Sequence, residues 1–443
     1  MWSRAASPKC GVALLTNHNV TMPSPSSALE RRLGLGDAVV IGLGSMIGAG
    51  VFAAFAPAAK AAGSGLLIGL AVAAIVAYCN ATSSARLAAL YPESGGTYVY
   101  GRRRLGDFWG YQAGWSFVVG KTASCAAMAL TFASYAAPAH VRLVGVLAVV
   151  ALTAVNYFGV QRSAWLTRLI VTLTLLTLVV VVIACLAGGR ASGHHLTPFP
   201  GTGVRGVLQA GGLLFFAFAG YARIATLGEE VREPARIIPR AITIALLITL
   251  VIYAVVGVSA LMAAGPSGLA ATTAPLRAAV DAGRLHALAP IVQIGGAIAA
   301  LGSLLALILG VSRTTLAMSR DSYLPTALAA VHPRFGVPHR AELAVGAVVA
   351  VLVATIDLRG AIGFSSFGVL AYYAIANASA MTLTRDEHRP PRWLPVLGLV
   401  GCVVLAVSLP ARSTIVGAGV LLLGALVFVA RRRWATTDGE TAR

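Results

Sequence analysis

Charge is scarce in this sequence. Asp, Glu, Lys and Arg make up 11% of its 443 residues, whereas hydrophobic residues make up 58%. Soluble domains carry about 25% charged residues. Residues 169–186 contain no charge at all, and apolar runs of the roughly 20 residues that cross a bilayer recur along the whole chain. This scarcity excludes a water-soluble globular domain and predicts an all-α integral membrane protein.

Patterns typical of several other protein classes are missing as well. No carboxylate lies deep in an apolar run, and no HExxH motif or buried Ser–His set is present, which disfavours a membrane-embedded enzyme. No selectivity-filter repeat or charged ring indicates a channel. The pair Gly42-x-Gly44 lacks the GxGxxG spacing of nucleotide-binding loops, so no cofactor is expected. The five cysteines show neither CxxC nor metal-ligand spacing and predict no metal site: Cys10, Cys79, Cys125, Cys185 and Cys402.

Apolar runs predict about twelve transmembrane helices. An even number puts both termini on one side of the membrane. If that side is the cytoplasm, 24 of the 34 Lys and Arg residues lie inside, eight lie outside, and Lys121 and Arg223 lie within helices. This bias follows the positive-inside rule. The predicted spans are 37–60, 65–90, 107–136, 140–160, 164–187, 206–229, 241–263, 288–318, 341–357, 361–384, 394–410 and 412–430.

The spans divide the chain into a membrane domain and two tails. The cytoplasmic excess of arginine accounts for the net charge of +19 in a multi-pass plasma-membrane protein, so lipid is the expected partner and nucleic acid is not. A more ordinary tail follows Met22, so the true start is Met1 or Met22. The predicted divisions are a disordered cytoplasmic tail (1–36), a membrane domain (37–430, with halves 37–187 and 206–384 and two further helices in 394–430) and a second cytoplasmic tail (431–443).

Glycines interrupt two spans at matching places. The first span contains GLGSMIGAGVF, in which Gly44 and Gly48 form a GxxxG pair that is typical of close helix packing. The same glycines would also favour an unwound segment, whose backbone groups must line a cavity or be buried in protein. The sixth span contains Gly220 among aromatic residues. Interrupted spans that open the two halves of a chain indicate a transporter binding site.

The motifs together resemble a known family. They are GSMIGAGVF in the first span, YPESGGTYVYGRRRLG after the second, FFAFAGYARIATLGEE in the sixth, VREPARIIPRAI after it, and SRTTLAMSRDSYLP at the end of the eighth. The chain resembles bacterial permeases of the amino acid–polyamine–organocation superfamily. That resemblance implies two inverted five-helix repeats plus two helices, with the first and sixth helices broken and a substrate bound between them.

The resemblance also implies a set of binding residues. Helix N-termini present N–H groups and a partial positive charge, which suit the carboxylate of an amino acid. Freed carbonyls at the end of a half-helix suit its ammonium, and Phe216 and Phe218 would cover the substrate, although either ring could equally be a packing aromatic. The implied substrate-binding residues are Ser45, Met46, Ile47, Gly48, Ala49 and Gly50 in the first span and Phe216, Ala217, Phe218 and Ala219 in the sixth.

Lys121 is the candidate for ion coupling. It lies about midway along the third span, where an ammonium costs at least about 2.5–3.5 kcal/mol to insert. Burial favours the neutral form of a lysine, so this side chain could release a proton during transport. A structural pairing with backbone carbonyls is the alternative. Some relatives carry a lysine in the fifth span, where this sequence has Thr174, and Ser303 is a further candidate for ion coupling that no carboxylate accompanies.

The sequence therefore predicts secondary active transport of an amino acid by alternating access. Without a deep carboxylate, a dicationic substrate such as a polyamine would meet no counter-charge, which favours a neutral amino acid. Proton-coupled symport is the predicted mechanism, and exchange of one amino acid or amine for another is the alternative.

Overall fold

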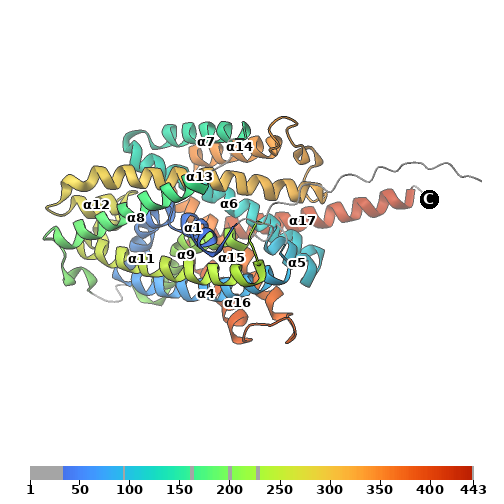
Figure 1. Cartoon of the computed structure of the whole chain (residues 1–443), viewed down its shortest axis with the longest axis horizontal. Helices are drawn as coiled ribbons and strands as arrows, with labels where there is room; N and C mark the ends of the chain where they lie inside the picture. The colour runs from blue at the N-terminus through green and yellow to red at the C-terminus, as the bar shows by residue number, and fades with distance from the viewer. Residues whose placement is uncertain (1–32, 93–94, 160–163, 198–201, 226–229, 442–443) are drawn as a thin grey trace, which may run out of the picture.

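The fold is entirely helical in the part of the chain that the structure describes. The computed structural model describes residues 33–92, 95–159, 164–197, 202–225 and 230–441. Within these ranges no strand forms, and the only β-type pairing is an isolated parallel bridge between Leu33 and Val231. Figure 1 shows the long helices lying roughly side by side, with the C-terminal helix extending beyond the bundle.

Ten helical segments among the described residues are long and apolar enough to cross a membrane. The two other predicted spans, 341–357 and 394–410, correspond to shorter helices of 17 and 16 residues. The prediction of an all-α multi-span membrane protein is confirmed. The α-helices are α1 (Leu35–Met46), α2 (Ala49–Ala53), α3 (Phe55–Ala62), α4 (Leu66–Leu90), α5 (Thr97–Leu105), α6 (Asp107–Ala136), α7 (Val141–Tyr157), α8 (Ala164–Ala187), α9 (Gly203–Phe218), α10 (Ala222–Ala225), α11 (Pro234–Ala270), α12 (Pro275–Asp281), α13 (Ala289–Arg320), α14 (His339–Thr355), α15 (Leu358–Met381), α16 (Trp393–Ser408) and α17 (Ala411–Thr441).

Some boundaries differ from the sequence prediction. The helix predicted at 241–263 begins earlier, at Pro234, because proline suits the first position of a helix, where no N–H partner is needed. Its far end continues past a kink at Gly265, which adopts a φ of 69°. The last helix runs to Thr441, so most of the predicted tail 431–443 is helical. Residues 226–229 of the predicted sixth span lie outside the described residues, as does most of the predicted tail 1–36.

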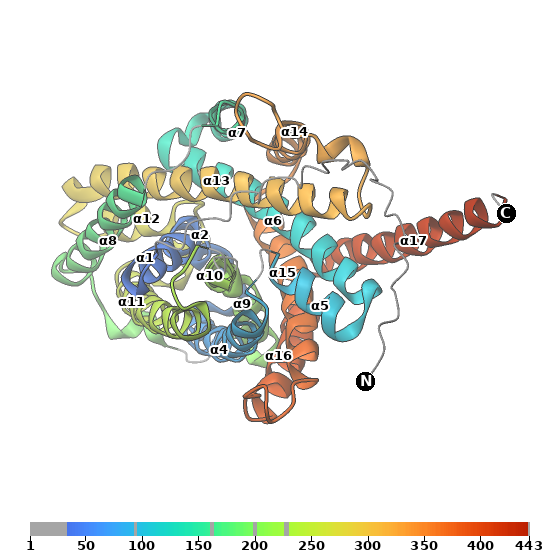
Figure 2. The ribbon, with the colours of Figure 1, turned by 45° about the vertical axis from the view of Figure 1, so that its right-hand side comes forward.

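The broken helices lie at the centre of the bundle. Figure 2 shows α1, α2, α9 and α10 surrounded by the longer helices. Helix α1 packs on α8 and α11, α9 packs on α3 and α4, and α6 packs on α13 and α15. Large apolar side chains face outward instead, such as Leu176, Val251 and Leu422, which are 57%, 62% and 62% exposed. An apolar outer surface is the arrangement expected of a protein in contact with lipid.

Small and polar residues fix helix α6 against α15. The backbones approach so closely at Gly120 and Gly368 that a Cβ on Gly368 would lie 2.8 Å from the Cα of Gly120. One turn along, the hydroxyls of Ser124 and Ser365 lie 2.5 Å apart. Close packing of small residues and interhelical hydrogen bonds are the usual means of helix association in membranes. This contact holds the segment of α6 that carries Lys121 in the interior.

Candidate functional site

The first span is interrupted in its middle. Helix α1 ends at Met46, and α2 begins at Ala49. Between them Ile47 has a ψ of 63° and Gly48 has φ −121° and ψ −134°, so neither continues the helix. A Cβ on Gly48 would lie 1.8 Å from the Ser303 Oγ, which explains why only glycine fits against α13 here. The unwound segment and close packing, which the sequence left as alternatives, occur together.

The sixth span is interrupted at the same level. Helix α9 ends at Phe218, residues Ala219–Tyr221 form a single 3-10 turn, and α10 starts at Ala222. The two interruptions touch, since a Cβ on Gly220 would lie 2.1 Å from the carbonyl oxygen of Ser45. Both interruptions are buried in protein, as broken backbone in a bilayer requires.

A tyrosine of α11 joins the two broken helices. The hydroxyl of Tyr253 lies 2.6 Å from the Met46 carbonyl oxygen and 3.0 Å from the Ala217 carbonyl oxygen, and it donates its proton between them. These are carbonyls at the ends of helical segments, where regular partners are lost. The Tyr253 ring also packs on Phe218, with ring centroids 5.1 Å apart. Tyr253 therefore stabilises both interruptions from the side.

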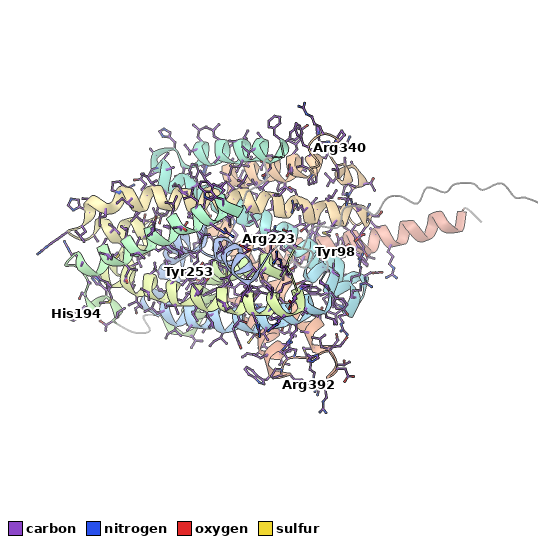
Figure 3. The ribbon with its side chains drawn as sticks, viewed as in Figure 1. Tyr98, His194, Arg223, Tyr253, Arg340 and Arg392 are labelled. Carbon is purple, nitrogen blue, oxygen red and sulfur yellow. The ribbon has the colours of Figure 1, made fainter. Side chains whose placement is uncertain are left out.

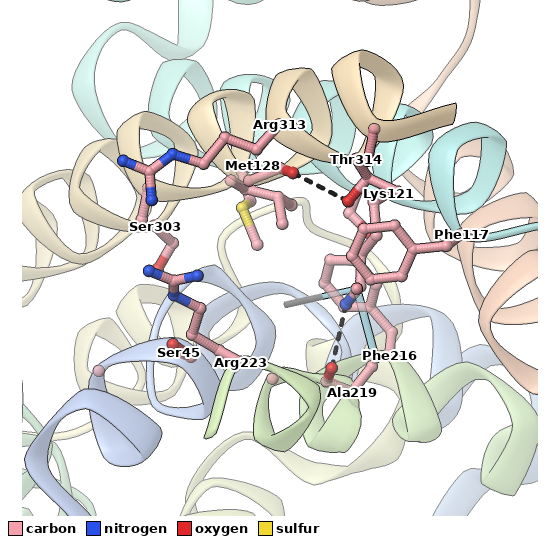
Figure 4. A pocket seen from close by; sticks show the side chains of 18 of the residues that line it. Ser45, Phe117, Lys121, Met128, Phe216, Ala219, Arg223, Ser303, Arg313 and Thr314 are labelled. Carbon is pink, nitrogen blue, oxygen red and sulfur yellow. Dashed lines mark hydrogen bonds between the residues drawn. The ribbon is translucent and has the colours of Figure 1, made fainter. Parts of the chain in front are cut away.

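A cavity of about 200 Å³ lies beside the two interruptions. It is smaller than the roughly 300–1,000 Å³ of pockets for drug-sized ligands, so it suits a small molecule. Figure 4 shows its side chains, which come from α1, α6, α9, α10 and α13. Its lining residues include Gly44, Ser45, Phe117, Lys121, Ser124, Met128, Phe216, Ala219, Gly220, Arg223, Glu230, Ser303, Leu307, Gly310, Arg313 and Thr314.

Lys121 extends from α6 across this cavity to the interrupted sixth span. Its side chain is 6% exposed, and its Nζ donates a hydrogen bond of 3.0 Å to the carbonyl oxygen of Ala219 (Figure 4). Ala219 begins the 3-10 turn, so its carbonyl is one that the helix break makes available. The alternative of a pairing with a backbone carbonyl is thus the arrangement seen, and it lies inside the cavity. Its role in ion coupling stays a prediction.

The cavity includes only part of the residue set that the resemblance implied. Ser45, Phe216, Ala219, Lys121 and Ser303 line it. Phe218 is fully buried against Tyr253 and does not line the cavity. The other predicted binding residues are also buried without lining it: Met46, Ile47, Gly48, Ala49, Gly50 and Ala217.

Several lining residues were not among the sequence candidates. Phe117, Ser124 and Met128 share the face of α6 that carries Lys121, at helical spacing from it, so the lysine could have pointed to them. Arg223 and Arg313 also line the cavity, and Figure 4 shows their guanidinium groups on the same side of it. Their local sequence does not indicate how α10 and α13 are rotated about their axes, so it does not predict that these arginines face the cavity. Figure 3 shows Arg223 within the bundle, whereas His194, Arg340 and Arg392 lie at its edges.

Positive charge dominates the cavity. Among the described lining residues, Lys121, Arg223 and Arg313 are cationic, and Glu230 is the one carboxylate. Glu230 follows α10, where its carbonyl accepts a 3.0 Å hydrogen bond from the Leu33 backbone N–H. The cavity thus extends from the helix breaks toward the loop after the sixth span.

Aromatic packing fills the space on the other side of the breaks. The Tyr135 hydroxyl of α6 donates a 2.9 Å hydrogen bond to the carbonyl oxygen of Phe52 in α2, and the two rings meet edge to face with centroids 5.6 Å apart. Both side chains are fully buried. A Cβ on Gly296 of α13 would lie 2.8 Å from the Tyr135 ring, so α2, α6 and α13 pack tightly against one another here.

Ion pairs cluster beyond the cavity, at the end of the bundle that carries the arginine-rich loops. Asp321 accepts hydrogen bonds from the Tyr98 hydroxyl and, at 2.9 Å, from Arg102 Nη1. Burial, together with the bond to this carboxylate, raises the pKa of Tyr98 far above its usual value. The backbone N–H of Thr384 donates to Glu387 at 2.8 Å and lowers the pKa of that carboxyl. The contacts of Asp321 tie α5 to the end of α13, and an ion pair between Arg104 and Glu387 ties α5 to the loop after α15.

Comparison with known proteins gives a consistent result. A family model described as "Amino acid permease" matches residues 33–430. An uncharacterized transporter of Mycobacterium tuberculosis is 66% identical over 420 residues, which cover 94% of this chain and 96% of the relative. The branched-chain amino acid permease BcaP of Bacillus subtilis is 26% identical, and the match covers 92% of this chain and 94% of the relative. Cationic amino acid transporter 4 of Homo sapiens is 27% identical, and the match covers 82% of this chain and 61% of the relative.

These matches extend over nearly all of the described helices, including both interrupted spans. The predicted resemblance is confirmed, and so is the prediction of a transporter rather than an enzyme. The chain belongs to the amino acid permease family and is a multi-pass membrane protein that transports amino acids.

Proposed function

We propose that this protein carries an amino acid by alternating access and couples its movement to protons through Lys121. The observation that carries the proposal is the hydrogen bond from the Lys121 ammonium to the Ala219 carbonyl. It puts a titratable group, a helix break and a small cavity in one place. An ionisable side chain at membrane depth is a functional candidate by default, because its insertion is costly.

The substrate that fits this cavity best is an amino acid without a cationic side chain. Three cationic residues and one carboxylate line the cavity among the residues described. A second positive charge on the substrate would be repelled by roughly 1–4 kcal/mol for each charge about 4 Å away, depending on how much water remains. An uncharged or acidic side chain avoids this cost. A neutral amino acid, as the sequence predicts, remains the first choice, since Phe117, Met128 and Leu307 give the cavity apolar walls.

The orientation follows from charge. With both termini in the cytoplasm of a plasma-membrane protein, the arginine-rich loops face inward. The cavity would then open toward the cytoplasm, and the Tyr135–Phe52 contact would close the outer side. Alternating access would require this contact to separate while the inner side closes over the cavity.

The test is transport by purified protein in proteoliposomes. Radiolabelled leucine, glutamate and arginine would be supplied in turn, with a pH gradient imposed in either direction and the membrane potential clamped. We expect leucine to enter faster than arginine and its accumulation to respond to the gradient. Equal uptake in protein-free liposomes, or arginine as the best substrate, would contradict the proposal.

A matched pair of lysine variants isolates the coupling residue. The sequence has three lysines, of which Lys60 is exposed on α3 and lies outside the cavity. Lys121→Met should abolish the response to the pH gradient, because methionine keeps most of the length of the side chain and removes the charge. Lys60→Met should leave both uptake and coupling as in the unmodified protein. Coupling that survives Lys121→Met would refute the role of Lys121.

A further inference from the structure

The lysine ammonium already occupies a position suited to the substrate's amine. A primary ammonium has three donors and no acceptor, so it seeks carbonyl oxygens. The Ala219 carbonyl, at the helix break and on the cavity wall, is such an acceptor, and Lys121 Nζ lies 3.0 Å from its oxygen. An amino acid bound between the interrupted helices would bring its own ammonium to the same carbonyls.

Two neighbouring carbonyls of the sixth span are engaged within the protein. The Ala217 carbonyl accepts from the Tyr253 hydroxyl, and the Phe216 carbonyl accepts from the backbone N–H of Ala219. Ala217 is also buried away from the cavity. The Ala219 carbonyl, in contrast, lies on the cavity wall, where a substrate can reach it directly. Two ammonium groups at one carbonyl would repel each other strongly in a site with little water.

From this geometry, and on the basis of the proposed function, we infer that the substrate ammonium and the protonated Lys121 compete for the Ala219 carbonyl, so that amino acid and proton cross the membrane in opposite directions. The protein is then a proton/amino acid antiporter. This differs from the symport that the sequence predicted. Antiport follows because the Ala219 carbonyl binds either the substrate ammonium or the protonated Lys121, so the protein that carries substrate across the membrane does not carry the proton on Lys121.

The cycle balances as follows. When substrate binds, an N–H bond of Lys121 breaks, its proton passes to cavity water, and the electron pair stays on Nζ. The substrate ammonium then donates a hydrogen bond to the Ala219 carbonyl while the cavity closes on one side of the membrane and opens on the other. After release on the other side, Lys121 takes a proton from water there and restores its bond to Ala219. The empty carrier returns with that proton, and one proton has moved against one amino acid.

Other titratable groups could modify this exchange, and they come from four helices and one loop. Cys125 lies one turn along α6 from Lys121, and Tyr372 of α15 packs on Phe117 with ring centroids 5.2 Å apart. Arg223 of α10, Glu230 of the following loop and Arg313 of α13 line the same cavity. The arginines stay charged at any pH at which the protein is folded. They disfavour a second cation in the cavity, which strengthens the competition.

The sign of proton movement tests the inference. Purified protein would be reconstituted into liposomes that contain a trapped pH-sensitive dye and have their membrane potential clamped with valinomycin and potassium. The amino acid identified as a substrate would then be added outside. Antiport makes the interior more alkaline as substrate enters, whichever way the protein is inserted. Acidification, which symport produces, or substrate entry without any pH change would overturn the inference.

The lysine variants show whether Lys121 carries the proton. In Lys121→Met we expect substrate to equilibrate without alkalinisation, whereas Lys60→Met should alkalinise the interior as the unmodified protein does. Alkalinisation by Lys121→Met at the unmodified ratio to substrate entry would also overturn the inference. If no substrate enters liposomes that contain the unmodified protein, the proposed transport function fails. That outcome differs from substrate entry without alkalinisation, in which only the antiport inference fails.

Binding to the unmodified protein decides the question even if Lys121→Met does not fold. Competition requires that substrate binding releases about one proton, measured by calorimetry in buffers with different ionisation enthalpies. It also requires that binding weakens by about tenfold for each unit that the pH falls below the range in which Lys121 becomes protonated. Proton uptake on binding, or an affinity that does not change with pH, would refute the competition.

Discussion

Replacing Gly220 with alanine should damage both stability and transport, because two backbones meet at this position. An added Cβ would lie 2.1 Å from the Ser45 carbonyl oxygen and 2.6 Å from the Met46 backbone nitrogen. Since ordinary contact begins at 3.4 Å, the interrupted first and sixth helices would have to separate by about 1 Å. Backbone atoms cannot rotate out of the way as a long side chain can.

The expected cost is that of overpacking a buried site, about 1–3 kcal/mol and more where the backbone is involved. The cost is a strain in the folded state, so thermal unfolding in detergent should begin at a temperature lower by roughly 2–6 °C. The separation also displaces Ala219, the neighbour of Gly220, and so disturbs its hydrogen bond with Lys121. We therefore expect amino acid uptake in proteoliposomes to fall by about tenfold or more, since 1.4 kcal/mol corresponds to a factor of ten.

A glycine of α17 provides the matched control. An added Cβ on Gly419 meets nothing within 4 Å, and this residue is far along the chain from both interruptions. Gly419→Ala should keep the uptake of the unmodified protein and lose no stability, because alanine favours a helix more than glycine does. Unchanged uptake and stability in Gly220→Ala would refute the contact between the two interrupted helices.

Three further predictions follow from single contacts. Gly48→Ala should reduce thermal stability, because the added Cβ would lie 1.8 Å from the Ser303 hydroxyl oxygen. Adding Ser303→Gly should recover about 0.5–3 kcal/mol in the double variant, since it removes the clashing side chain. Strictly additive effects of the two substitutions would contradict this contact. Tyr253→Phe should cost about 1–3 kcal/mol in thermal unfolding assays, since two buried carbonyls lose the hydrogen bond from its hydroxyl, and no change would refute the bridge. The Thr384 backbone N–H lowers the pKa of Glu387, so this carboxylate stabilises the fold above its ordinary pKa of 4.5. That stabilisation is lost as the pH falls from 4.5 through the lowered pKa of the folded protein. In melting curves that extend from neutral pH to well below the ordinary pKa of 4.5, Glu387→Gln should show a smaller loss of stability, and an equal loss would exclude this contribution.

The sequence alone determined the membrane class and the position of the helix breaks. Apolar runs of sufficient length leave no other way to satisfy the backbone in lipid than a helix, so the spans could be predicted within a few residues. Glycines at Gly48 and Gly220 marked both interruptions because they remove the side chains that would keep the backbones apart. Boundaries outside the apolar runs, such as the start of α11 at Pro234, were less well predicted since hydropathy does not mark a helix end in water.

Only the tertiary structure decided which groups face the cavity. A helix break can be read from composition, but the rotation of α6, α10 and α13 depends on packing between segments far apart in the sequence. That packing brings the Lys121 ammonium to the Ala219 carbonyl and sets Arg223 and Arg313 on the cavity wall, while it buries Phe218 against Tyr253. The sequence supplies the charged groups, and long-range contacts choose their partners, because each span in lipid can rotate about its own axis until neighbouring helices fix it.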